Sequence, residues 1–280
     1  MRSTWSEDNV TELRRLWHEH GGGIDRIAKS MGRSRGSISG KSLKLGLQFH
    51  GGRAKVLDDQ HPAIREGRTL FRHRVHTATL GVLKSGANQR KLGDVVEKGK
   101  WRGFPIYSLT LEERATCPRS CIVYNSCYGN NSSMAKRYRH GIALERAIVA
   151  DLVRLQELHP RGFVVRLHQL GDFYSVAYVD FWADRLDEFP ALHVFGYCAR
   201  QLDDVIGERV IALREFAWDR FAVRTSGAKT GPRTMVIDIP ESAPDAIVCP
   251  AQTERTRNCS TCGLCWTEAA MHRPIAFLQH

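Results

Sequence analysis

Apolar residues recur at helical spacing through residues 5–47, and glycines interrupt the pattern twice. The spacing of Val10, Leu13 and Trp17 predicts a first helix that ends at the glycine run 21–23. Shorter apolar stripes predict a second helix before Gly32 and a third after it, with Ser6 and Ser34 placed to cap the first and third. Two helices joined by a tight glycine turn, the second of them basic, indicate a helix-turn-helix arrangement.

From residue 104 onward, strand-like and helix-like patterns alternate. Strands are predicted at 104–109, 163–168, 192–197, 221–224 and 234–239, and helices at 134–158, 178–189 and 203–216. This alternation favours a mainly parallel, partial-barrel-like α/β sheet. In such sheets the functional groups gather at the carboxyl ends of the strands.

The patterns divide the chain into three parts: a helix-turn-helix head (1–47), a basic linker (48–79) and a cysteine-rich α/β domain (80–280). No apolar run approaches the roughly 18–20 residues that a membrane span needs, so no membrane partner is expected. The N-terminal residues lack a hydrophobic signal region, and we therefore expect a cytoplasmic protein.

The formal net charge is +11, and nearly all the excess lies in residues 1–100. Basic charge concentrated beside a helix-turn-helix pattern predicts double-stranded DNA as a partner. A three-helix module that binds another protein is the alternative. The third predicted helix and the turn before it supply the candidate DNA-binding residues: Arg33, Arg35, Ser37, Ser39, Lys41 and Lys44.

Seven of the eight cysteines fall into two tight groups. The first thiol group is Cys117, Cys121 and Cys127, and the second is Cys249, Cys259, Cys262 and Cys265. Because cytosolic thiols stay reduced, both groups are predicted to be metal ligands rather than disulfides. The second group has the C-x2-C-x2-C spacing of ferredoxin-type iron–sulfur ligands, which favours a 4Fe-4S cluster, while zinc is the alternative. The groups could hold one cluster each or share one.

Polar residues close to the end of the second predicted strand are candidate cofactor-binding residues: His168, Gly171 and Asp172. Strand alternation places His168 on the same face as Arg166. A buried, hydrogen-bonded histidine and a helix-capping aspartate are the structural alternatives.

The head resembles the DNA-binding domain of the GcrA cell-cycle regulators, chiefly in Ser37–Leu47 with its G-K-x-x-x-L-G-L ending. Residues 80–280 resemble the phage "gene product 88" family in Cys127-Tyr128-Gly129, the run 166–174 and Cys262–Trp266. That resemblance implies relatives in phages and mobile elements rather than a particular reaction. A thiol loop after the first strand also resembles the radical SAM enzymes, which implies S-adenosylmethionine as a candidate cofactor. The chain departs from the C-x3-C-x2-C spacing of those enzymes, and Gly171-Asp172 replaces their glycine pair and acid.

These observations lead to one main hypothesis and two alternatives. The main hypothesis is a DNA-binding iron–sulfur protein that acts as a transcriptional or redox-responsive regulator. The first alternative is a radical SAM-like enzyme that acts on nucleic acid. The second is a zinc-stabilised DNA-binding protein without catalysis. The pattern does not indicate the DNA sequence, a substrate or the oligomeric state.

Overall fold

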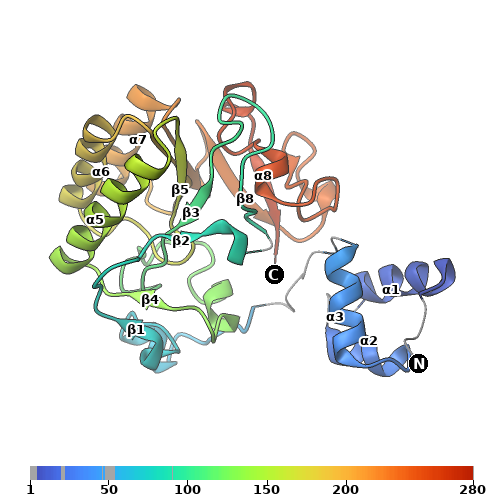
Figure 1. Ribbon diagram of the computed structural model, residues 1–280. Coiled ribbons are helices and arrows are strands. Elements are labelled where there is room, and N and C mark those ends of the chain that lie inside the picture. The colour runs from blue at the N-terminus through green and yellow to red at the C-terminus, as the bar shows by residue number, and fades with distance from the viewer. Residues whose placement is uncertain (1–4, 20–22, 46, 48–53, 90, 280) are drawn as a thin grey trace.

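The computed structural model describes residues 5–19, 23–45, 47, 54–89 and 91–279. The first three helices, α1 (Glu7–Glu19), α2 (Ile24–Ser30) and α3 (Arg35–Lys44), form a separate group in Figure 1. They enclose a core of their own, which consists of Leu13, Leu16, Trp17, Ile27, Ala28, Ile38 and Leu47. The hydroxyls of Ser6 and Ser34 each accept a main-chain N–H of their helix at 3.2 Å. The predicted helices and both serine caps are confirmed.

The rest of the molecule is built on an eight-stranded sheet with the order β2-β3-β5-β6-β7-β8-β10-β9. Its strands are β2 (Lys84–Ser85), β3 (Ile106–Ser108), β5 (Phe163–Leu167), β6 (Leu192–Cys198), β7 (Phe221–Ser226), β8 (Arg233–Ile237), β9 (Ile247–Val248) and β10 (Ile275–Leu278). Neighbouring strands are parallel except at the β2–β3 edge, where the pairing is antiparallel. The prediction of a mainly parallel α/β sheet is therefore confirmed.

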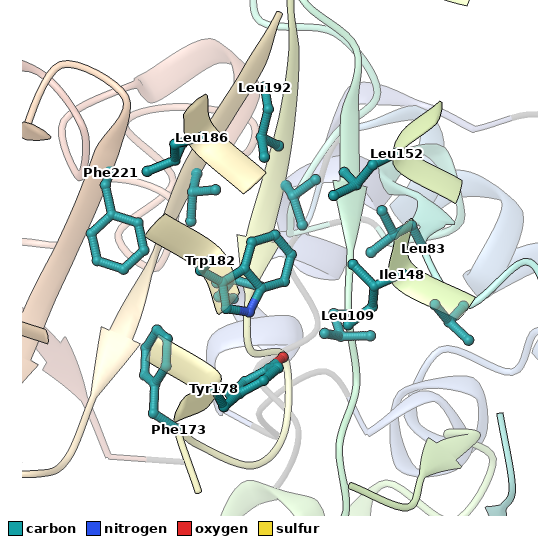
Figure 2. Close-up of a cluster of buried hydrophobic side chains, with 14 of the residues drawn as sticks. Leu83, Leu109, Ile148, Leu152, Phe173, Tyr178, Trp182, Leu186, Leu192 and Phe221 are labelled. Carbon is teal, nitrogen blue, oxygen red and sulfur yellow. The ribbon is translucent and has the colours of Figure 1, made fainter. Parts of the chain in front are cut away.

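Three helices, α5 (Ile142–Leu158), α6 (Val176–Glu188) and α7 (Val205–Ala217), pack on one face of this sheet (Figure 1). The largest core fills the space between them and the strands, and Trp182 and Tyr178 of α6 lie near its centre (Figure 2). Alternate strand residues such as Val165, Val194 and Val223 point into this core. We call this side the helix face.

The opposite side, which we call the inner face, has a smaller core. It contains Leu92, Val96, Trp101, Ile106, Val164, Phe195, Trp218, Ala222 and Trp266. The covering residues come from the segment before β3 and from the segment that includes the short helix α8 (Cys259–Cys262). The rings of Trp101 and Trp266 stack with their centroids 5.5 Å apart. The cysteine-rich segment is thus part of the inner-face packing.

The described residues also contain a two-stranded sheet and the short helix α4 (Pro62–Arg65), which follows the head in sequence. Strand β1 (Val75–His76) pairs with β4 (Arg137–Tyr138) in parallel. The sequence predicts a helix over 134–158, but α5 begins only at Ile142. The start is wrong because residues 137–138 are extended and because Gly141, at φ 117°, adopts a conformation that a helix excludes.

Candidate functional site

The loops that follow β3, β5 and β6 meet at the carboxyl ends of these parallel strands. The loop after β3 contains the first thiol group, and the loop after β5 contains His168 and Asp172. The carboxylate of Asp172 joins two of these strand ends, because it accepts the main-chain N–H groups of Phe173 at 2.8 Å and Ala199 at 2.7 Å. Asp172 also interacts electrostatically with Cys117 and Cys121. The expected convergence at this edge is therefore present for these residues.

The three thiols of the first group lie close enough to interact with one another. Cys117 interacts electrostatically with Cys121 and Cys127, and each sulfur accepts one main-chain N–H, from Arg114, Val123 and Gly129 respectively. The Gly129 nitrogen is 3.4 Å from the Cys127 sulfur. Burial nevertheless raises the pKa of all three thiols, that of Cys121 to about 11. In the metal-free chain the thiols are therefore protonated at neutral pH, although the charge of Arg114 lowers the pKa of Cys121 and Cys127 somewhat.

A buried ion pair supports the loop that holds this group. Arg137 and Glu113 are 0% and 1% exposed, and the Arg137 Nε donates to a Glu113 carboxylate oxygen at 2.6 Å. Arg137 also donates to the carbonyls of Gly129, Ser132 and Ala135, while the Thr69 hydroxyl donates to Glu113 at 2.7 Å. The loop is fixed from both sides.

The second thiol group lies on the inner face. Cys259 begins α8, which Asn258 caps, and the Cys259 main-chain N–H donates to the Lys91 carbonyl at 2.8 Å. The Tyr197 hydroxyl of β6 donates to the Cys265 sulfur at 3.0 Å. Burial is the main cause that raises the pKa of Cys259 to about 11 and of Cys265 to about 12. Cys249 interacts electrostatically with both of them, and Cys262 interacts with Cys259.

All eight cysteines have free thiols. Among the described residues, no three His, Cys, Asp or Glu side chains are arranged to hold one metal ion. The structure therefore shows no formed metal site among these residues. Metal ligation by the seven cysteines stays a prediction.

The candidate cofactor-binding residues have structural contacts that account for their positions. Burial, and then the charge of Arg166, lower the pKa of His168 to about 3. Its ring packs against Phe173 and Tyr178 of the helix-face core, so the prediction that it shares a face with Arg166 is wrong. The reason is that β5 ends at Leu167, and strand alternation stops there.

Gly171 is required sterically. Its φ is +86°, and a Cβ atom there would lie 2.6 Å from the Leu111 Cβ and 2.7 Å from the Thr116 Oγ1. The cofactor role of His168, Gly171 and Asp172 stays a prediction.

In the head, the candidate DNA-binding residues differ in their side-chain contacts and exposure. Arg33 lies 4.1 Å from the centroid of the Trp5 ring and donates to the Asn9 side chain at 2.6 Å, so it holds α1 against the turn. Lys41 also lies over Trp5, at 5.6 Å. Arg35 forms an exposed ion pair with Asp25 at 2.7 Å. The side chains of Ser37 and Ser39 are partly buried, and Lys44 is exposed.

The inner face also contains a polar row that the sequence analysis did not identify as a site. Ser108, Arg166, Tyr197 and Arg224 come from four neighbouring strands, β3, β5, β6 and β7, near their carboxyl ends. The period-2 pattern predicts that alternate residues face this side, but Arg166 and Arg224 look like ordinary strand charges in the sequence. Their surroundings come from segments far away along the chain.

Comparison with known proteins gives no assignment. No family model, curated protein or solved structure matches the chain. Within the described residues, no helix combines the length and the apolar character needed to cross a membrane.

Proposed function

We propose that the protein is a DNA-binding iron–sulfur regulator of the phage or mobile-element type. The head binds double-stranded DNA, and the thiol groups bind iron and sulfide, most simply as a 4Fe-4S cluster. Three thiolates leave one iron of such a cluster with an open position, which makes it sensitive to oxidants and small ligands. The state of the cluster would then govern how the head binds DNA.

One observation supports this coupling above all: the segment that follows the head in sequence is attached directly to the first thiol loop. Leu57, Ala63 and Ile64 form a small core with Tyr124, against which Cys117 and Cys121 pack. A change in the position of these thiols would therefore be transmitted to residues 57–64, which follow the head in sequence.

Hydrogen bonds between residues 57–65 and the first thiol loop reinforce this attachment. Asn125 lies between Cys121 and Cys127, and its side-chain amide donates to the Asp59 carboxylate at 2.7 Å. Its main-chain carbonyl accepts the Leu57 N–H at 3.1 Å. Arg119, which lies between Cys117 and Cys121, donates to the main-chain carbonyls of Ile64 and Arg65. Residues 57–65 and the thiol loop thus form one hydrogen-bonded unit.

The sulfur environment supports the choice of iron and sulfide. Main-chain N–H groups point to all three sulfurs of the first group, and hydrogen bonds to the sulfurs are one of the means by which proteins tune iron–sulfur clusters. Because burial keeps the free thiols protonated, metal binding must release protons. It must also draw the sulfurs into an arrangement that the described residues do not yet have.

The test is anaerobic purification of the full chain, with measurement of iron, acid-labile sulfide and visible absorption. Wild type and Cys198→Ser, which removes a buried thiol outside both groups, should contain equal iron and sulfide, whereas Cys121→Ser should lose most of both. Zinc without iron or sulfide would replace the proposal with a zinc-stabilised DNA-binding protein. No bound metal in wild type would refute both.

DNA binding is tested separately with a duplex of mixed sequence at several salt concentrations. Lys44→Gln should weaken binding and reduce the slope of log affinity against log salt by about 1, because one phosphate contact is lost. Arg15→Gln is the matched control, since Arg15 is paired with Glu12 and Glu19 on α1. Equal affinities for wild type and Lys44→Gln would contradict the assignment of α3 to the DNA interface.

An enzyme is the second candidate, and the strand order favours it. From β3 to β8 the parallel strands are adjacent in chain order, with helices on one face and the first thiol loop directly after β3. This arrangement is similar to the plan of the radical SAM enzymes. Incubation of the iron-loaded protein with S-adenosylmethionine and dithionite should then produce methionine. An iron-loaded protein that leaves S-adenosylmethionine intact would favour the regulator.

A further inference from the structure

Two arginines of the polar row on the inner face occupy similar positions but have opposite surroundings. Arg224 donates to five main-chain carbonyls, those of Leu264, Cys265, Ala270, Met271 and Arg273. The side chain of Arg166, two strands away, donates no hydrogen bond to any described residue, and its buried Nε has no partner. Its guanidinium carbon lies 5.6 Å from the centroid of the Tyr197 ring. Among the described residues, Arg166 therefore has no carboxylate partner. Its neighbours that can carry negative charge, Tyr128, Tyr197, Cys259 and Cys265, all have raised pKa values and are protonated at neutral pH in the metal-free chain.

Lys91 adds a second cation beside it. Its Nζ lies 5.4 Å from the centroid of the Phe277 ring, and that ring packs edge-on against Tyr197 at 5.3 Å. Lys91 interacts electrostatically with Arg166 and with the thiols of Cys249, Cys259 and Cys265, and no carboxylate of the described residues is among its charged neighbours. Two like charges at a partly buried place cost free energy unless an anion joins them.

We infer that Arg166 and Lys91 bind a small oxyanion, a carboxylate or a phosphate group, at the carboxyl end of β5. An arginine fork pairs with both oxygens of such a group, and the ammonium group of a lysine adds a point charge. Ser108 lies opposite Arg166 on the neighbouring strand β3, and its hydroxyl accepts from the Gln89 side chain at 2.6 Å. Ligands of parallel α/β sheets bind at this end of the strands.

Arg166 lies near residues of both thiol groups. Arg166 interacts electrostatically with Cys259 and Cys265 of the second group and with Tyr128, the residue after Cys127. The Tyr128 hydroxyl donates to the carbonyl of Gln169 in the loop after β5. A small anion bound here lies between the two thiol loops. A nucleic-acid strand is a poorer fit than a small ligand, because the inner-face core covers this region.

The experiment is thermal unfolding of the full chain at constant ionic strength, with phosphate or malonate in place of chloride. For wild type, an anion at about ten times its dissociation constant should raise Tm by about 3 °C. The larger of the two shifts identifies phosphate or carboxylate as the ligand class. In chloride alone, Arg166→Met should have a higher Tm than wild type, because it removes an unpaired charge, and it should not respond to either anion.

Arg224→Met is the matched control. It leaves five carbonyls without their donor, so its Tm should fall while its anion response persists. The proposal is wrong if neither anion shifts wild type, if Arg166→Met still responds, or if Arg166→Met loses stability as Arg224→Met does. If Arg166→Met does not fold, Lys91→Met is used instead. A Tm shift with the anion that equals that of wild type in this variant overturns the proposal. No arm of this test depends on DNA or metal.

Discussion

Replacement of Glu113 by Gln tests whether the buried pair with Arg137 fixes the first thiol loop. The change keeps the shape of the side chain but leaves the Arg137 charge without its counter-ion, at a place where both residues are at most 1% exposed. Removal of one partner of a buried pair costs about 3–5 kcal/mol. Arg137 keeps three carbonyl acceptors, so we expect the lower end, about 3 kcal/mol.

The assay is thermal unfolding of the metal-free chain, together with the labelling rate of individual thiols measured by mass spectrometry. A loss of about 3 kcal/mol lowers Tm by about 6 °C or more in a chain of this size. Cys117, Cys121 and Cys127 should be labelled faster than in wild type, while Cys259 and Cys265 should keep their rates.

Asp180→Asn is the control, because Asp180 and Arg209 form an ion pair whose side chains are 45% and 44% exposed. Exposed pairs contribute about 0–1 kcal/mol, so this variant should unfold within about 2–4 °C of wild type. A Glu113→Gln protein that matches Asp180→Asn in both Tm and labelling would refute the view that the pair holds the loop.

Three further predictions concern other parts of the fold. Gly171→Ala should lower Tm by several degrees, because a Cβ at this position collides with Leu111 and Thr116. Gly99→Ala should lower Tm by less, because Gly99 also has a positive φ but has open space around it. Burial lowers the pKa of His193 to about 4, so its contribution to stability is present above its ordinary pKa of 6.5 and is lost as pH falls toward 4. Urea titrations at several pH values should therefore show that His193→Phe loses less stability than wild type over that range. Trp5→Ala should weaken DNA binding without any loss of charge, because Arg33 and Lys41 both lie over that ring, and circular dichroism should show that α1–α3 persist. Unchanged Tm, identical pH curves or unchanged DNA affinity would contradict these three expectations in turn.

The sequence predicted those parts of the fold in which local pattern and tertiary structure agree. The strands and helices from residue 163 to 237 were predicted within a few residues because buried parallel strands are apolar runs and the helices between them are amphipathic. Strands β9 and β10 were not predicted. They are short, and β10 pairs with β8, whose partner residues are 41 positions earlier in the chain (Thr234 with Ile275). Strands of two and four residues are too short to leave a recognisable pattern in the sequence.

The candidate site shows the same division. Cysteine spacing is a local property, so the sequence alone suffices to define the two thiol groups as candidates, and their metal ligation stays a prediction. The buried charges were missed because their hydrogen-bond partners are distant in sequence. Arg224 donates to main-chain carbonyls of residues 264–273. Arg166 lies near Tyr197 and the second thiol group, and its Nε has no acceptor. The extent of the linker could not be judged either, since hydrogen bonds from Asn125 and Arg119 reach residues 57–65 across more than fifty positions.

The place of β10 has a consequence for synthesis of the protein. This strand lies between β8 and β9, although the ribosome makes it after both. Until residues 275–278 emerge, β8 has an unpaired edge and β9 has no neighbour, while the earlier strands can already associate. A nascent chain at that stage exposes a template for pairing with other chains. Chaperones should therefore bind most strongly to chains in which residues 275–278 have not yet paired with β8 and β9.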